Sequence, residues 1–147
     1  MLEDFIEVNN LDSKIIKVST DTAVGKAVSS KLIPPNLAVD IKLFNSGKND
    51  PLLVVVPHSS EIDFSVVNEL LEGEAIEMDE RETIDITGYK KNCLPPISIY
   101  GIRIVIDSSL ENKEYLFCKS GEKQFLKASM KDILETNDDV SFKKITI

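Results

Sequence analysis

The residues of this sequence that could carry out chemistry are few and widely spaced. His58 is the only histidine. Histidine can act as a general base near neutral pH, but no acidic partner lies at a recognisable spacing, so we interpret His58 as a surface residue at a strand end. Cys93 and Cys118 lie far apart, and we expect both to be reduced thiols. The sequence shows no neighbouring base or helix N-terminus that would activate Cys93 as a nucleophile.

The same scarcity bears on metals and other cofactors. With one histidine and no clustered cysteines, the sequence lacks the usual ligand spacing of a zinc site. We therefore expect a protein that works without a metal and without any other cofactor.

The charge balance argues against a broad phosphate-binding surface. Lys plus Arg number 17 against 25 Asp plus Glu, which gives a net charge of −8 at pH 7. A protein that binds duplex nucleic acid by neutralising phosphates is expected to be basic, so DNA is not an expected partner. A small local patch remains compatible with this average, and its candidate lysines are Lys42, Lys48, Lys90, Lys91, Lys119 and Lys123.

Length and hydropathy predict the general class of protein. The chain has 147 residues, 42% of them hydrophobic, which predicts one domain over residues 1–147 with a substantial core. The longest apolar run, residues 52–56, is far shorter than the roughly 20 residues that span a bilayer. The first residues include early acids and no basic segment before an apolar stretch, so we predict no signal peptide. These features favour a cytoplasmic protein that does not bind membranes.

Helix and strand signals alternate along the chain. Capping residues and apolar spacing predict helices over residues 2–11 and 23–32, then a helix that opens at residues 59–63, one over residues 79–86 and one from Ser129 onward. In the third of these, Phe64, Val67, Leu70 and Leu71 form the predicted inner face, and Gly73 is the predicted C-cap. Strands are predicted over residues 14–18, 37–44, 52–56, 75–78, 102–107, 115–118 and 124–128, with the second and third paired as a hairpin. This order favours an α+β fold with a mixed sheet.

One ordered set of motifs resembles a known family. The set comprises Val-Val-Val-Pro at 54–57, Glu-Ile-Asp-Phe at 61–64, Thr-Gly-Tyr at 87–89, Leu-Pro-Pro at 94–96, Gly101, Ile-Asp-Ser-Ser-Leu at 106–110, Lys-Ser-Gly-Glu at 119–122 and Ala-Ser-Met-Lys-Asp-Ile-Leu at 128–134. Their order and spacing over residues 22–134 resemble the YbaK/prolyl-tRNA editing domain family. The resemblance implies a mixed, curved β-sheet with surrounding helices and a pocket for the aminoacyl-adenosine end of tRNA. It also implies a metal-free aminoacyl-tRNA deacylase, which hydrolyses tRNA that carries a wrong amino acid. Such editing is needed because one methylene changes the binding of an amino acid to a synthetase by only ~1–3 kcal/mol, too little for accurate charging.

In that family a Gly-x-x-x-Pro loop cradles the scissile ester. The matching residues here run from Asn92 to Pro96, and the resemblance implies a catalytic role for both ends of the loop. Asn92-Cys93 stands where the family has Gly-Gly. Asparagine tolerates left-handed conformations best among non-glycine residues and could keep the backbone path, whereas Cys93 adds a Cβ that would reshape the pocket. Cys93, Leu94 and Pro95 are the implied pocket-lining residues of the loop.

A family lysine that contacts the terminal phosphate has two candidate positions here. Counting from the Pro-Pro turn without gaps places Asp40 there, whereas a shift of two residues places Lys42 there. Both residues would lie on the same strand face, because side chains alternate with period two. Lys42 is the predicted catalytic residue. If Asp40 held the family position instead, an anion would replace the cation that contacts the terminal phosphate, and binding of the tRNA end would be weaker.

The remaining matches are candidates for substrate binding or for support of the pocket. Gly88 and Gly101 supply backbone freedom, and Tyr89 could pack under the loop with its hydroxyl bonded. Asp107 could either position substrate or cap the turn after its strand. The full set of implied substrate-binding residues outside the Asn92–Pro96 loop is Thr87, Gly88, Tyr89, Gly101, Asp107, Ser120 and Gly121.

Two functions remain open from the sequence. The first is a trans-editing deacylase that hydrolyses mischarged tRNA, with Ala- or Cys-charged tRNA-Pro as the expected substrate. Its expected partners are the tRNA acceptor end and prolyl-tRNA synthetase or another carrier. The second is a catalytically degenerate module that binds tRNA or aminoacyl-adenosine, which the Asn92-Cys93 replacement, the displaced lysine and the acidic surface favour.

Overall fold

A computed structural model describes residues 1–47 and 50–147 of the chain; Lys48, one of the lysines of the candidate patch, lies outside the described residues. The helices are α1 (Leu2–Val8), α2 (Val24–Ser29), α3 (Phe64–Leu71), α4 (Glu80–Thr87), the short 3-10 helix η1 (Ser108–Leu110) and α5 (Met130–Thr136). The strands are β1 (Lys14–Lys17), β2 (Val39–Asn45), β3 (Leu52–Pro57), β4 (Ile76–Glu77), β5 (Arg103–Asp107), β6 (Tyr115–Gly121), β7 (Gln124–Ser129) and β8 (Val140–Lys143).

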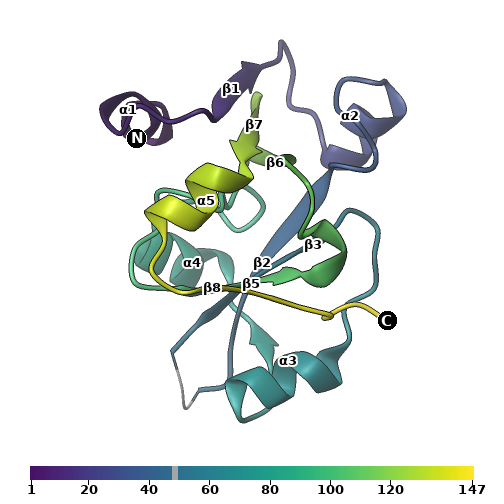
Figure 1. The fold of residues 1–147 in the computed structure, drawn as a ribbon, viewed down its shortest axis with the longest axis vertical. Helices are drawn as coiled ribbons and strands as arrows, with labels where there is room; N and C mark the ends of the chain where they lie inside the picture. Colours follow the sequence, from purple (N-terminus) through teal and green to yellow (C-terminus); the bar gives the residue numbers. More distant parts are fainter. Residues whose placement is uncertain (48–49) are drawn as a thin grey trace.

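These strands form two sheets, and the larger one is mixed. Its order is β4-β2-β3-β5-β8, in which β4, β2 and β3 pair antiparallel and β3, β5 and β8 pair parallel. The smaller sheet, β1-β7-β6, is antiparallel. The α+β class with a mixed sheet and surrounding helices is therefore confirmed (Figure 1).

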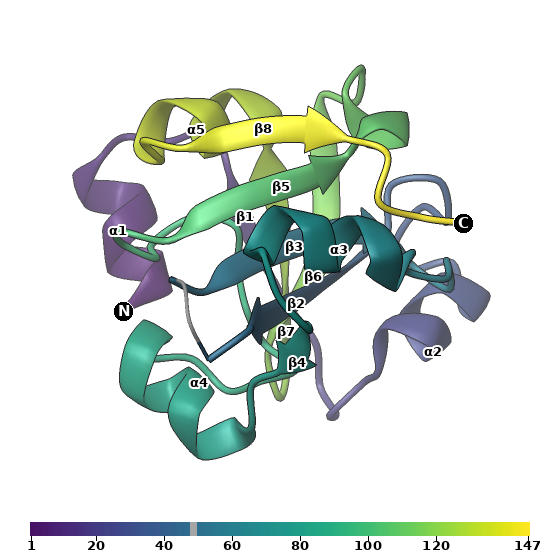
Figure 2. The same ribbon diagram turned by 90° about the horizontal axis from the view of Figure 1, so that it is seen from below.

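The central strands are covered on both faces. On one face Val54 and Val56 pack with Val67 and Leu71 of α3, the helix that lies across the sheet in Figure 2. On the other face Leu53 and Val55 join a core cluster that includes residues of β6 and β7. This double burial explains why Val105 and Asp107 of β5 are as buried as Ile104 and Ile106.

Several helix boundaries differ from the predictions. The helix predicted over residues 23–32 is only α2, Val24–Ser29, because Ser30 ends it and Lys31 takes a positive φ of 64° before the Pro-Pro turn. In α3, Glu72 rather than Gly73 adopts the left-handed C-cap conformation. Phe64 is 50% exposed and contacts the core through the edge of Phe44. These ends are set by tertiary contacts that intrinsic propensity does not encode.

The N-terminus of α5 is held by a long-range contact. Ser129 Oγ accepts from the Asp132 N–H at 3.4 Å, as expected of an N-cap serine. The Asp132 carboxylate does not return to Ser129, however, but accepts from the N–H and hydroxyl of Ser13 at 2.7 and 2.6 Å. Ser13 Oγ in turn accepts from the Ser129 N–H at 2.9 Å. Ser13, the residue before β1, therefore closes the cap. Strand β8, which the sequence did not predict, follows α5 and completes the edge of the larger sheet.

Candidate active site

One cavity brings together the residues predicted on the β2 strand and on the 92–96 loop. Its volume is about 560 Å³. The lining residues come from β2, the end of β3, β4, β6, α2 and the loop after α4, and they are Asp21, Ala23, Val24, Gly25, Val39, Asp40, Ile41, Lys42, His58, Glu77, Lys91, Asn92, Leu94, Cys118 and Lys119. Segments far apart in the sequence therefore contribute to one cavity lined by both charged and apolar side chains.

Strand β2 presents both candidate residues of the displaced family lysine to this cavity. Asp40 and Lys42 lie two residues apart on one strand, so their side chains share a face. Lys42 Nζ lies 3.7 Å from Glu77 Oε1, and Lys91 Nζ lies 3.5 Å from Glu77 Oε2. One carboxylate thus holds two ammonium groups at this wall, and a phosphate that approached Lys42 would compete with Glu77.

Asp40 also has a partner that sequence reasoning missed. Its Oδ1 lies 3.0 Å from His58 Nδ1, and its Oδ2 accepts from the Ser59 N–H at 3.4 Å. The interpretation that His58 has no acidic partner is therefore wrong, although His58 does follow the end of β3 and is partly exposed. The antiparallel register, which pairs Val39 with Pro57, places the end of β3 beside Asp40 although 18 residues separate the two side chains. Extending the second predicted strand of the hairpin by two residues, from Val56 to His58, would have revealed the pair.

A third lysine also lines the cavity. Lys119 on β6 is only 14% exposed, and its ammonium group binds the Asp21 carboxylate and the Thr22 carbonyl oxygen, the latter at 2.7 Å. Among the lining residues, three carboxylates (Asp21, Asp40 and Glu77) face three lysines (Lys42, Lys91 and Lys119). The cavity is therefore close to neutral in a chain whose net charge is −8.

The 92–96 loop lies at the cavity with only part of its length. Asn92 and Leu94 line the cavity, whereas Cys93, Pro95 and Pro96 are buried and do not. The Pro96 carbonyl oxygen accepts from Asn137 Nδ2 at 2.9 Å. Asn92 does not use a positive φ, contrary to the expectation; the left-handed residue of this region is Ser98, with a φ of 67°. The loop is thus held from its C-terminal side.

The Thr-Gly-Tyr motif makes contacts within the protein and does not reach the cavity. Thr87 Oγ1 donates to the Thr83 carbonyl oxygen at 2.7 Å and accepts from the Tyr89 N–H at 3.0 Å. Gly88 is the left-handed C-cap of α4, with a φ of 81°. The Tyr89 hydroxyl donates to Ser98 Oγ at 2.9 Å. The motif therefore ties the end of α4 to the far end of the 92–98 segment.

Asp107 is likewise bound by the protein. Its carboxylate accepts from the N–H and hydroxyl of Ser109, from the Ile145 N–H at 3.0 Å and from the Thr146 hydroxyl at 3.1 Å. Burial by itself would raise the pKa of Asp107, but the hydrogen bonds from Ser109, Ile145 and Thr146 outweigh it and hold that pKa below its usual range. This carboxylate caps η1 and anchors the C-terminal segment.

The other predicted binding residues also lie away from the cavity. Ser120 is buried, and its Oγ has no hydrogen-bond partner among the described residues. Gly121 lies against Gln124, whose Cγ would be 2.8 Å from an added Cβ. Gly101 lines a different cavity. A substrate-binding role for these three residues stays a prediction.

Both cysteines are free thiols. Burial raises the pKa of Cys118 to about 12, with a smaller contribution from Cys93 nearby. Burial also raises the pKa of Cys93, although Lys119 and Lys90 act in the opposite direction. Both shifts disfavour the thiolate, which is the nucleophilic form.

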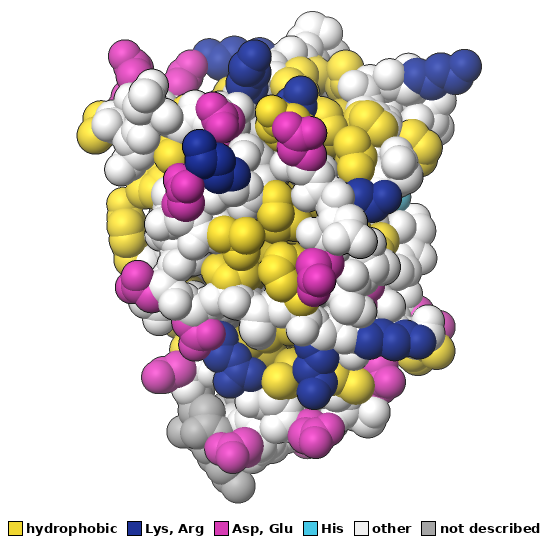
Figure 3. All heavy atoms as spheres, viewed as in Figure 1, with side chains coloured by type: hydrophobic (Ala, Val, Ile, Leu, Met, Phe, Trp, Pro, Cys, Tyr) yellow, Lys and Arg dark blue, Asp and Glu magenta, His cyan; other side chains and the backbone are white. Residues whose placement is uncertain are grey.

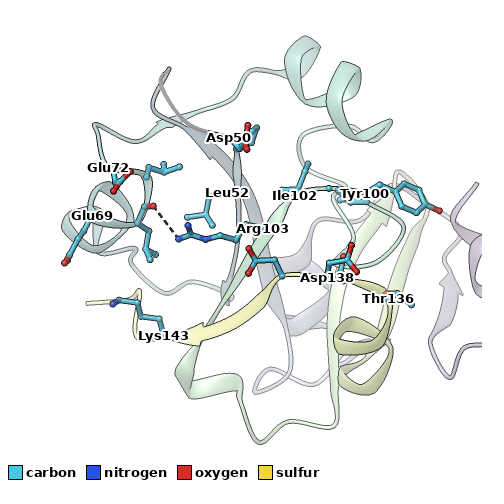
Figure 4. A pocket seen from close by; sticks show the side chains of 17 residues that line it. Asp50, Leu52, Glu69, Glu72, Tyr100, Ile102, Arg103, Thr136, Asp138 and Lys143 are labelled. Atoms are coloured by element: carbon cyan, nitrogen blue, oxygen red, sulfur yellow. Dashed lines mark hydrogen bonds between the residues drawn. The ribbon is translucent and has the colours of Figure 1, made fainter.

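A second cavity, of about 770 Å³, lies between α3, the start of β5 and the segment around residues 136–139 (Figure 4). Arg103 lies at its centre and donates through Nη2 to the Leu70 carbonyl oxygen at 3.4 Å. Of the predicted site residues only Gly101 lines it. Although this cavity is larger, it gathers none of the predicted catalytic residues.

Three further observations concern possible ligands and partners. In residues 1–47 and 50–147, no group of three or more His, Cys, Asp or Glu side chains is arranged to hold a metal ion. Within the same residues, no helix combines the length and the apolar character needed to cross a bilayer. On the face shown in Figure 3, lysines and acidic residues are interspersed, without a broad area of one sign.

Comparisons with known proteins identify the family and the fold of this chain. A crystal structure of hypothetical protein APE2540 superposes with a TM-score of 0.84 at 18% identity, covering 99% of both chains. That of a proposed trans-editing enzyme for prolyl tRNA synthetase gives a TM-score of 0.82 at 15% identity, covering 99% of this chain and 94% of the other. No curated protein sequence matches significantly. The family model of the aminoacyl-tRNA editing domain matches residues 19–133, and the chain therefore belongs to the aminoacyl-tRNA editing domain family.

Proposed function

We propose that this protein is an aminoacyl-tRNA deacylase that hydrolyses the ester of mischarged tRNA, with Ala- or Cys-charged tRNA-Pro as substrate. The observation that carries the proposal is the near-neutral cavity lined by Lys42 of β2 together with Asn92 and Leu94, in a chain of the editing-domain family. A charged acceptor end carries only a few phosphates, so a local site suffices despite the acidic net charge. Prolyl-tRNA synthetase or another carrier is a proposed partner, since a structural neighbour is described as acting for that synthetase.

In the proposed reaction, water attacks the carbonyl carbon of the aminoacyl ester. The backbone of the 92–96 loop, fixed by the Asn137 contact to Pro96, orients the ester and the water. Lys42 contacts the terminal phosphate after exchanging its contact with Glu77. The terminal ribose hydroxyl of the tRNA assists the departure of its neighbouring oxygen.

The test is a deacylation assay with Ala-, Cys- and Pro-charged tRNA-Pro. We expect hydrolysis of at least one mischarged substrate above the buffer rate, and a loss of about 10-fold or more in kcat/KM for Lys42→Ala, because charged hydrogen bonds contribute about 1.5–3 kcal/mol. Lys131→Ala is the matched control, since Lys131 is exposed on α5 and outside the cavity. Buffer-level hydrolysis of all three substrates would contradict the proposal.

A second function is a module that binds the aminoacyl end without hydrolysing it. It is favoured by the pairing of Lys42 and Lys91 with Glu77, which lowers the positive charge available to phosphate. This function predicts no change in the half-life of the ester in the deacylation assay, together with saturable binding of charged tRNA in a separate titration.

A further inference from the structure

We propose that His58, oriented by Asp40, is the general base of the reaction. This inference rests on the proposed function and adds to it a residue that takes the proton of the attacking water. The pair stands where the family resemblance led us to look for a single cation, and it lines the same cavity as Lys42.

The hydrogen bond between the two side chains fixes which nitrogen carries the proton. A carboxylate can only accept hydrogen bonds, so in the 3.0 Å contact His58 Nδ1 donates and Asp40 Oδ1 accepts. In neutral His58 the lone pair then lies on Nε2, the nitrogen that can accept a proton from water. In residues 1–47 and 50–147, no hydrogen bond occupies Nε2.

His58 Nε2 lies at the cavity, where a general base must be. An added Cβ at Gly25 would lie 3.5 Å from His58 Nε2, and Gly25 itself lines the cavity. His58 Nε2 therefore lies beside the backbone of α2 at the cavity, where a side chain at residue 25 would contact it. The side chains of His58 and Asp40 are 25% and 31% exposed, so water reaches the pair while the protein holds it.

The turn after His58 is held in a costly conformation. Ser59 has a φ of 67°, in the left-handed region that non-glycine residues seldom use. The turn is closed by Ser60, whose N–H and hydroxyl both donate to the Pro57 carbonyl oxygen, at 3.1 and 2.6 Å. This conformation directs the Ser59 N–H to Asp40 Oδ2 at 3.4 Å, so the backbone next to His58 helps to orient its partner.

The proposed step is balanced in protons and electrons. A lone pair on the water oxygen forms a bond to the carbonyl carbon of the ester while His58 Nε2 takes one proton of that water. The tetrahedral intermediate then collapses and the bond between the carbonyl carbon and the ribose oxygen breaks. His58 returns the proton to the departing ribose oxygen, which leaves a free amino acid, a free tRNA end and neutral imidazole.

His58→Ala tests the role of the base directly. We expect kcat on mischarged tRNA to fall by about 10²–10⁴-fold, the usual contribution of general acid–base catalysis. Added imidazole should restore part of that activity, which would not happen if His58 only supported the fold. An active wild-type protein whose His58→Ala variant keeps kcat within about 3-fold would overturn this inference and leave the deacylase function standing.

Asp40→Asn tests the positioning residue. The amide can donate to Nδ1 and so place the proton on Nε2, which should lower kcat by roughly 10²-fold. Asp12→Asn removes the same charge at an exposed residue outside the cavity and should keep wild-type activity.

The tautomer can be read without any substrate by 15N-resolved NMR of the single histidine. We expect the proton on Nδ1 in the wild-type protein and on Nε2 in Asp40→Asn. A proton on Nε2 in the neutral wild-type ring would overturn the role of His58 even if the protein is an active deacylase. Buffer-level hydrolysis by the wild-type protein, with the expected tautomer, would overturn the deacylase function and the catalytic role together.

Discussion

Asp40 and Asp107 are two aspartates on strands of the same sheet, and their surroundings are opposite. Asp107, at the end of β5, is 1% exposed and accepts from four donors of three residues. Asp40, on β2, has one side-chain partner and one weaker N–H contact, and it faces the cavity. A carboxylate whose acceptor positions are filled by the protein stabilises the fold, whereas one with a single imidazole partner can support chemistry.

The largest expected effect is a difference in unfolding free energy between variants of these two aspartates. Asp107→Ala leaves the buried Ile145 N–H and its neighbours without an acceptor, so we expect the free energy of unfolding to fall by about 3 kcal/mol or more. Asp40→Ala removes a partly exposed pair and should cost about 1 kcal/mol or less. Urea denaturation of both variants measures the contrast, and equal losses would break the comparison.

Acid should weaken the Asp107 contacts selectively. Because the pKa of Asp107 is lower in the folded protein than the ordinary value of 3.8, its carboxylate stabilises the fold fully above that value. This contribution is lost as the pH falls through the lower folded-state pKa. The difference in unfolding free energy between wild type and Asp107→Asn should be constant above about pH 5 and shrink below 3.8. A difference that grows on acidification would contradict this assignment.

The sequence predicted the cores of the elements but not the side-chain partnerships. Apolar spacing and capping signals located β2, β3 and α3 because these depend on local pattern. The Asp40–His58 pair and the Ser13–Asp132 contact depend on strand register and on segments 18 and 119 residues apart. The motif residues Tyr89 and Asp107 were visible as a family pattern, but a pattern of residue types does not distinguish a group that contacts substrate from one that supports the fold.

Cys118 differs from Asp40 and His58, which line the same cavity, because it is almost completely buried. Since burial raises its pKa to about 12, very little thiolate forms near neutral pH. We expect iodoacetamide at pH 8 to alkylate Cys118 in the folded protein at least about 100-fold more slowly than in urea-unfolded protein. Mass spectrometry of the modified peptide gives both rates, and Cys93, whose pKa burial also raises, is followed in the same digest. Rapid alkylation of folded Cys118 would show that the cavity wall opens.

Lys42 should affect the cavity without affecting the fold. Lys42→Met removes a cation that Glu77 holds at 3.7 Å, so we expect weaker binding of charged tRNA, by about 10-fold at low salt, and a log–log salt slope smaller by about 1. The unfolding free energy should change by less than about 1 kcal/mol, because the pair is partly exposed. Fluorescence titrations at several salt concentrations measure the slope, with Lys131→Met as the control for a lysine outside the cavity. An unchanged slope would mean that Lys42 does not contact phosphate.

The smallest expected effect concerns the segment of residues 92–98, which joins the cavity to the supporting core. Asn92 and Leu94 line the cavity at its start, and Ser98 at its end is bound by Tyr89. Tyr89→Phe removes the 2.9 Å hydrogen bond to Ser98 Oγ and should lower the unfolding free energy by about 1 kcal/mol, the usual net value of one buried hydrogen bond. Tyr100→Phe, at a side chain 76% exposed, is the matched control and should change it by less than about 0.5 kcal/mol. Because Asn92 and Leu94 are also held by the Asn137 contact to Pro96, deacylation by Tyr89→Phe should stay within about 3-fold of wild type. A larger loss of activity with little loss of stability would show that Tyr89 contributes to the reaction as well as to the fold. The 92–98 segment would then belong to the active site along its whole length.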